Sequence, residues 1–178
     1  LNLEPTQHDA HGIEITTLMS YRTRAVEDLI RALKYDRATH AARILSESLA
    51  EYLREEIASI RLFSARPIII APIPLHASRL HERGFNQVDV ILQHLPTEFK
   101  DGTHAQYVPG LLERMRATAQ QTRLSRNERL KNVAGAFAVP NAATIRNASI
   151  ILIDDVTTTG ATLASAAKAL EKSGARVT

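Results

Sequence analysis

Residues 150–162 read IILIDDVTTTGAT, which is four aliphatic residues, two adjacent aspartates and then a run of threonines closed by a glycine. The aliphatic run predicts a buried strand, and the residues from Gly160 onward predict a helix. Asp154 and Asp155 then stand at the carboxyl end of the strand. In open α/β sheets this is the edge where ligands bind, so the stretch predicts both the fold class and a site.

The residue types in this stretch indicate the chemistry of its ligand. Exposed amides in the first turn of the helix form an anion site, and Gly160 allows the tight turn before it. Hydroxyls of Thr158, Thr159 and Thr162 can donate to phosphate oxygens. The carboxylates would repel a phosphate, so they must face hydrogen-bond donors or positive charge, such as a ribose diol or hydrated Mg²⁺. A ribose 5-phosphate offers a phosphate to the amides and hydroxyls and a diol to the carboxylates.

Two alternatives stay open for the paired aspartates. Such pairs also bind Mg²⁺ in receiver domains and in nucleotide-hydrolysing folds, although the chain contains no GxxxxGK[ST] sequence and a P-loop is therefore excluded. The other alternative is a purely structural strand, turn and helix, which would rarely place two adjacent carboxylates at its end.

The periodicity along the rest of the chain predicts one α/β domain over residues 20–178, preceded by an irregular N-terminal segment over residues 1–19. Strands that alternate with helices, without hairpin turns, indicate a mostly parallel sheet covered on both faces. The chain should end as another strand begins, at ARVT. Helices are expected from Ser20, with Ser20 as N-cap, and over 39–60, 86–95, 125–132 and 160–172, and strands at 67–74, 104–108, 136–139 and 149–154.

The amino-acid composition limits the kinds of site, the location and the ligands expected of the protein. The 178 residues include no cysteine, which excludes disulfides and thiolate metal sites, and no apolar run is long enough for membrane insertion. A cytoplasmic location follows by default. The net charge of +3 suits an anionic ligand. His8 and His11 could share a metal, but without further ligands nearby we interpret them as part of a solvated tail.

A basic segment supplies candidate counter-charges for a polyanion. Residues 114–131 contain five arginines and a lysine against one acid, Glu128. A solvated basic face explains this composition as well as a binding role does.

Three further blocks narrow the interpretation: LIRALKYD at 29–36, PIPLHASRLHERGFNQ at 72–87 and RMRATAQQTRLSRNERLKNVAGAF at 114–137. Together with the aspartate and threonine stretch, which resembles the binding motif of type I phosphoribosyltransferases, they resemble the ComF family of competence-associated proteins. The resemblance extends from about Tyr21 to the end of the chain.

The resemblance implies a Rossmann-like type I phosphoribosyltransferase fold with a flexible hood, which binds Mg²⁺ and phosphoribosyl pyrophosphate. The catalytic residues that it implies are Asp154, Asp155, Arg114 and Arg116. Mg²⁺ would be bound through the substrate, and any direct protein ligands of the ion would be the two aspartates. The substrate-binding residues that it implies are Thr158, Thr159, Gly160, Ala161, Thr162, Lys34, Pro72, Arg79, Arg83, Asn86, Gln87, Gln121, Arg129 and Asn132.

Two departures from the family limit what can be carried over. Members commonly have a cysteine-rich zinc module, and without cysteine we expect no structural zinc. Thr158 stands where some purine-specific relatives have an acid, so no general base can be named and the nitrogenous acceptor stays unknown.

Three functions remain: a phosphoribosyltransferase, a non-catalytic sensor of phosphoribosyl pyrophosphate, and a DNA-uptake accessory that binds single-stranded DNA. Four tyrosines, four phenylalanines and no tryptophan offer few stacking platforms for the last of these. DNA-uptake proteins and a second copy of the chain, as a homodimer, are further candidate partners.

Overall fold

A computed structural model describes residues 3–36, 38–116 and 135–178 of the chain. Its centre is a four-stranded parallel sheet in the order β4-β3-β7-β8, formed by β3 (Ile68–Pro72), β4 (Gln106–Tyr107), β7 (Ser149–Ile153) and β8 (Arg176–Val177). Strands β3 and β7 pair over their full length, from Ile68 with Ser149 to Pro72 with Ile153. The predicted α/β class with a parallel sheet is confirmed.

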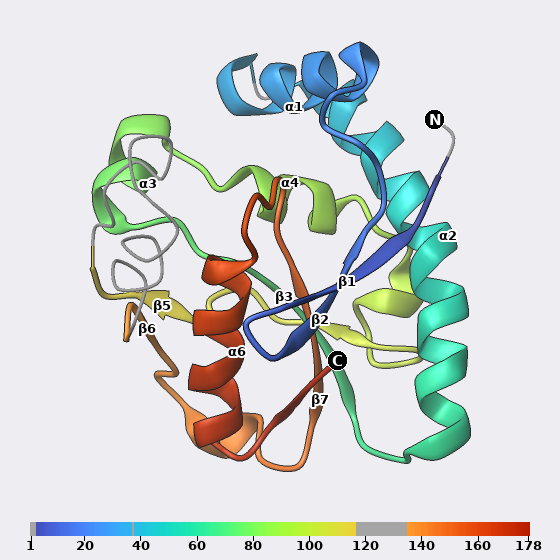
Figure 1. Cartoon of the computed structure of the whole chain (residues 1–178), viewed down its shortest axis with the longest axis vertical. Helices are drawn as coiled ribbons and strands as arrows, with labels where there is room; N and C mark the ends of the chain where they lie inside the picture. The colour runs from blue at the N-terminus through green and yellow to red at the C-terminus, as the bar shows by residue number, and fades with distance from the viewer. Residues whose placement is uncertain (1–2, 37, 117–134) are drawn as a thin grey trace.

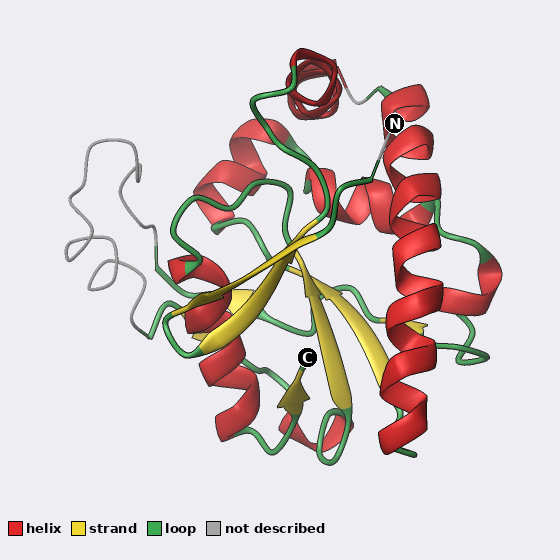
Figure 2. Ribbon diagram, turned by 45° about the vertical axis from the view of Figure 1, so that its right-hand side comes forward, coloured by secondary structure: helices red, strands yellow, loops and turns green. Residues whose placement is uncertain are grey.

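Helices cover both faces of this sheet (Figures 1 and 2). Helices α2 (Thr39–Phe63) and α4 (Gln87–Gln93) pack on one face, α1 (Arg24–Asp36) packs on α2 and extends the same core, and α6 (Ala161–Lys172) packs on the other face. Two short 3₁₀ helices, η1 (Thr97–Phe99) and η3 (Ala142–Thr144), lie in the connections.

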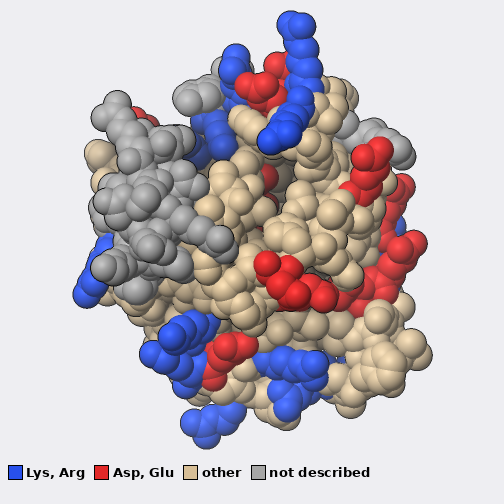
Figure 3. Space-filling model, viewed as in Figure 1, with Lys and Arg blue, Asp and Glu red and all other residues tan. Residues whose placement is uncertain are grey.

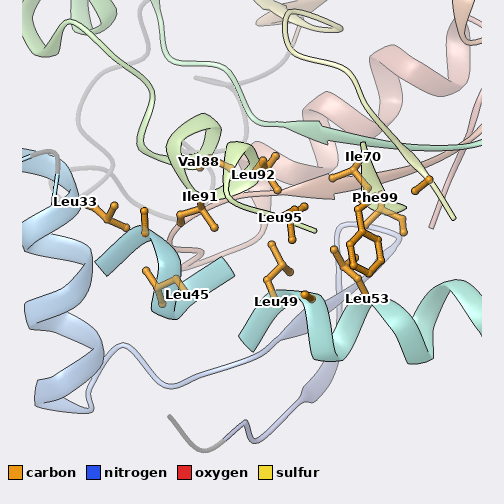
Figure 4. Close-up of a cluster of buried hydrophobic side chains, with 14 of the residues drawn as sticks. Leu33, Leu45, Leu49, Leu53, Ile70, Val88, Ile91, Leu92, Leu95 and Phe99 are labelled. Carbon is orange, nitrogen blue, oxygen red and sulfur yellow. The ribbon is translucent and has the colours of Figure 1, made fainter. Parts of the chain in front are cut away.

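The protein has two hydrophobic cores, one on each side of the sheet, because successive side chains of a strand point to opposite faces. Ile68 and Ile70 of β3 and Ile151 of β7 face the first group of helices, whereas Ile69 and Ile150 face α6. Figure 4 shows the first core, in which leucines of α1 and α2 meet side chains of α4. Because both faces of β3 and β7 are covered, these strands are apolar over Ile68–Pro72 and over residues 150–153, as the sequence predicted.

The N-terminal segment is not irregular, and the prediction that the fold lacks hairpins was wrong. Strands β1 (Thr6–Ala10) and β2 (Ile13–Thr17) form an antiparallel hairpin, whose turn residues His11 and Gly12 have φ of 56° and 84°. Such positive values fit a two-residue hairpin turn. The strand β1 is almost entirely exposed and polar, so the usual apolar signal is missing, and only Ile15 of β2 is deeply buried.

Helix boundaries followed the predictions in part. Helix α1 begins at Arg24 and not near Ser20, because Ser20 forms a preceding turn: its carbonyl accepts from the Thr23 amide and its hydroxyl from the Arg22 amide. The short helix α3 (Ala77–Arg83) was not predicted. Helix α4 has Asn86 as its N-cap, and Gly174, with φ of 90°, follows the C-cap of α6.

A second, small antiparallel pair lies beside the main sheet. Strand β5 (Glu113–Arg114) pairs with β6 (Phe137–Ala138), and the Met115 amide donates to the Ala136 carbonyl. The predicted strand over 136–139 is thereby confirmed in shortened form. The helix predicted over 125–132 and most of the expected hood segment lie outside the described residues.

Candidate functional site

The loop after β7 has the geometry that the sequence predicted. Asp154 and Asp155 directly follow the last residue of the strand, and Gly160, with φ of 72°, turns the chain into α6 at Ala161. The Ile73 amide donates to the Ile153 carbonyl over 2.8 Å, which extends the pairing of the two central strands to the base of the loop. The carboxylate pair is therefore attached directly to the central strands of the sheet.

Gly160 is required for a second reason besides its backbone conformation. A Cβ at this position would lie 2.5 Å from Ile15 Cδ1 and 2.7 Å from Ala10 Cβ. The hairpin thus packs directly on the loop. Sequence reasoning missed this contact because it treated residues 1–19 as a solvated tail.

The start of α6 fits the predicted phosphate site. Its N-cap residue, Gly160, makes no side-chain hydrogen bond to the first turn, and the start of a helix attracts anions. The hydroxyl of Thr159 is buried and has no hydrogen-bond partner among the described residues. Thr158 is exposed beside it. A buried hydroxyl without a partner costs free energy unless a ligand or water satisfies it, which favours a polar ligand at this loop.

Lys34 at the end of α1 reaches the carboxylate pair. Its Nζ lies 2.7 Å from Asp155 Oδ2, and the two side chains are 24% and 9% exposed. The Asp155 amide donates to Asp154 Oδ1 over 3.0 Å, so the two aspartates are held together. The structure therefore brings three of the predicted site residues into one cluster.

Electrostatics links this cluster to the basic residues. Burial raises the pKa of Asp154 well above its ordinary value, and the charge of Asp155 raises it further, while Arg114 acts in the opposite direction. Burial lowers the pKa of Arg114, which Asp154 raises and Arg79 lowers. The Arg114 guanidinium also lies over the Phe137 ring, 5.6 Å from its centroid. Arg114 thus lies within electrostatic range of both Asp154 and Arg79.

Three other predicted residues lie behind the loop that follows β3. Asn86 is buried, accepts from the Val88 amide and donates to the Ile73 carbonyl over 3.0 Å. Gln87 is also buried and accepts a hydrogen bond from Arg83. Asn86 and Gln87 thus have a structural task, and their contact with a ligand stays a prediction.

The structure gives less detail about the remaining predicted site residues. Pro72 ends β3 and is buried, and Arg116 is exposed just after β5. Gln121, Arg129 and Asn132 lie outside the described residues.

A cavity of about 730 Å³ opens between the hairpin, α1, α2 and the end of β7, and Asp154 and Asp155 form part of its wall. Figure 3 shows acidic side chains deep in a recess below α1. Apolar residues of α1 and α2 form another wall, and Tyr52 donates to Glu56 Oε2 over 3.1 Å. Sequence reasoning missed Tyr52 and Glu56, although their spacing of four places both on one face of α2.

Asp154 and Asp155 suit a shared Mg²⁺ better than a metal held by protein alone. Among the described residues, no group of three or more histidine, cysteine or acidic side chains could hold a metal ion. Mg²⁺ commonly takes one or two carboxylates and completes its shell with water and substrate phosphates, which fits two adjacent aspartates beside an anion site. The histidines of the hairpin belong to no such group.

No helix in the described part of the chain is long and apolar enough to cross a membrane.

Comparison with known proteins places the chain among competence-related proteins. No family model matches it. It is 34% identical to DNA utilization protein YhgH of Escherichia coli over 148 residues, which is 83% of this chain and 61% of the relative. It is 30% identical to competence protein ComFC of Streptococcus pneumoniae over 165 residues, 93% of this chain and 65% of the relative.

A shorter match has the same character. Over 114 residues the chain is 35% identical to competence protein F of Haemophilus influenzae, which covers 61% of this chain and 46% of the relative. The chain thus spans about three fifths of the length of the YhgH relatives. The names and extent of these relatives agree with the blocks quoted from the sequence, and the chain belongs to the ComF family.

Proposed function

We propose that this protein binds phosphoribosyl pyrophosphate with Mg²⁺ and transfers the phosphoribosyl group to a nitrogen nucleophile. One observation carries the proposal: a carboxylate pair at the end of β7 precedes a threonine-rich loop, which turns at Gly160 into a helix start without a side-chain cap. The pair would face the ribose hydroxyls and the metal. The 5-phosphate would bind the amides and threonine hydroxyls of residues 158–162.

Basic residues near the site support binding of the pyrophosphate part of the ligand. Arg114 and Arg79 act on the electrostatics of the site, and Lys34 reaches Asp155. A pyrophosphate group that departs with several negative charges needs such counter-charges, fixed in place before the reaction. Bound Mg²⁺ would neutralise part of the same charge.

The reaction itself demands little covalent chemistry from the protein. The nitrogen lone pair forms the bond to ribose C1 while the electrons of the C1–O bond leave with pyrophosphate. When the nitrogen carries hydrogen, its proton passes to water. The protein holds the two reactants in line and excludes competing water, which is worth a large part of the barrier.

Titration calorimetry with phosphoribosyl pyrophosphate and Mg²⁺ tests the proposal. The double variant Asp154→Asn/Asp155→Asn keeps the shape of both side chains, so it should fold and bind at least about tenfold more weakly, because charge-assisted hydrogen bonds are worth about 1.5–3 kcal/mol each. Glu55→Gln, on the exposed face of α2, is the control. Unchanged affinity in the double variant would exclude this site. Pyrophosphate release with a panel of nucleobases then separates turnover from sensing.

A second candidate function comes from the names of the relatives, which concern DNA utilization and competence. A single-stranded DNA accessory would use a distributed basic surface, and its affinity for an oligonucleotide would fall steeply with salt. The same titration with an oligonucleotide at two salt concentrations tests this function. If this second function is correct, the Asp154→Asn/Asp155→Asn variant should still bind the oligonucleotide.

A further inference from the structure

The candidate site is divided into a positive and a negative half. Arg79, Arg114 and the start of α6 form the positive half, which suits the polyanionic donor. The cavity below the hairpin forms the other half. Asp154 and Asp155 lie at the boundary, because they line the cavity and Asp154 also interacts with Arg114.

Charges around the cavity are strongly unbalanced. Five acidic residues line it against a single basic one, and these six residues are Glu14, Glu56, Asp154, Asp155, Glu171 and Arg22. Lys34 lies nearby, but it is paired with Asp155. The side chain of Asp155 is only 9% exposed, and its Oδ2 is buried against the Lys34 ammonium. The cavity therefore presents net negative charge from the remaining acidic residues.

The rest of the wall combines apolar and polar side chains. Leu45 and Leu49 of α2 and Ile30 of α1 supply an apolar surface. The polar part of the wall includes Thr16 of the hairpin and Tyr52 of α2, whose hydroxyl donates to Glu56. Such a combination of an apolar wall and a few polar groups is typical of a small-molecule site.

We propose that the nitrogen acceptor enters this cavity and is an uncharged or cationic compound, not one that carries a carboxylate. This inference rests on the proposed function and names the acceptor class that it leaves open. The acidic wall attracts N–H groups and positive charge and repels an acid. The separation also keeps the acceptor away from the arginines that the donor needs.

Three small probes that share a six-membered nitrogen ring test the acceptor class: nicotinamide, nicotinate and 4-aminopyridine, which is a cation at neutral pH. Each is titrated into the full chain without Mg²⁺ or donor, so that the aspartates keep their charge, and binding is followed by ligand-observed NMR. We expect nicotinamide and 4-aminopyridine to bind at least about tenfold more tightly than nicotinate, since each differs from it by at least one unit of charge in a partly enclosed site. Equal binding of the three, tighter binding of nicotinate, or no binding of any at millimolar concentration would overturn the proposal.

A matched pair of variants on α2 shows whether the cavity is responsible. Glu56 lines the cavity, whereas its neighbour Glu55 does not. Glu56→Gln keeps an oxygen that can accept from Tyr52, so the fold should survive, and the preference against nicotinate should shrink about threefold, as expected for one partly screened charge. Glu55→Gln should leave the preference unchanged. If both variants behave alike, the proposal fails; Glu14→Gln, on the exposed side of β2, repeats the test should Glu56→Gln not fold.

The two proposals fail in different ways. If the Asp154→Asn/Asp155→Asn variant binds phosphoribosyl pyrophosphate normally, the proposed function is wrong. If the donor binds as expected but the probes show no charge preference, only the acceptor class is wrong.

Discussion

Lys34 Nζ lies 2.7 Å from Asp155 Oδ2 and so fastens the end of α1 to the loop that follows β7. The pair is only partly shielded, since the lysine side chain is 24% exposed, while the aspartate is 9% exposed. Removal of one partner therefore has different consequences for the lysine and for the aspartate. The lysine can turn towards water, but the aspartate cannot.

Replacement of Lys34 by Met should therefore destabilise the protein more than Asp155→Asn does. Leaving a buried carboxylate without its partner costs about 1–3 kcal/mol. At about 2–4 °C per kcal/mol, the melting temperature should fall by several degrees. Thermal unfolding of both single variants and the double variant measures the effect. A coupling energy of zero in this cycle would show that the ion pair does not form in solution.

Gly160 gives a second prediction, with an internal control. Gly160→Ala should cost about 1–2 kcal/mol for the left-handed backbone and about 1–3 kcal/mol more for the clash with Ala10 and Ile15. Gly110 has φ of 71°, and a Cβ added to it would meet no other group within 4 Å, so Gly110→Ala should show the backbone cost alone. Urea denaturation compares the two variants. Equal losses would mean that the hairpin does not pack on the loop.

These contacts show what the sequence could and could not predict. The aliphatic run before Asp154 predicted β7 correctly because a strand covered on both faces is apolar along most of its length, here over residues 150–153. Gly160 was predicted to allow a turn, but its contact with Ile15 joins distant segments and leaves no local pattern. The same holds for Lys34, whose position at the end of a helix equally suits a simple interaction with the helix dipole.

The hairpin was missed for a different reason. Strand β1 consists almost wholly of polar, exposed residues, so its stability comes from its pairing with β2 and not from burial of its own side chains. The alternation of Ile13, Ile15 and Thr17 after the His11 and Gly12 turn was the available signal. The cavity depends on this hairpin, and hence its residues Glu14 and Thr16 could not be recognised as wall residues before it was known.

Asn86 offers a test of structural against ligand-binding roles. Its buried side chain makes two hydrogen bonds, to the Val88 amide and the Ile73 carbonyl, so Asn86→Ala should cost about 1–3 kcal/mol. Asn141 caps η3 in the same way but is exposed, and Asn141→Ala should cost about 0.5–1 kcal/mol. Chemical denaturation gives both values. A similar, small loss in the two variants would indicate that Asn86 is kept mainly for its ligand.

The acidic pair predicts an unusual dependence of stability on pH. Burial and the charge of Asp155 raise the pKa of Asp154 in the folded protein, so the folded state binds its proton more tightly than the unfolded state. Stability should then fall as the pH rises from the ordinary value of 3.8 through the folded pKa, and stay constant above it. Asp154→Asn removes this proton, and the variant should gain stability relative to the wild type across that window.

A second aspartate with the opposite shift supplies the control. Hydrogen bonds from Thr103 lower the pKa of the exposed Asp101, so its contribution is present above its ordinary pKa and is lost as the pH falls through the lowered value. Relative to Asp101→Asn, the wild type should thus gain stability as the pH rises, whereas relative to Asp154→Asn it should lose stability. Melting temperatures of the three proteins, taken at steps of about one pH unit from about pH 3 to about pH 8, measure both differences. A difference from Asp154→Asn that does not change with pH would mean that the carboxylate is solvated, and that the packing of Asp154 behind the hairpin does not persist in solution.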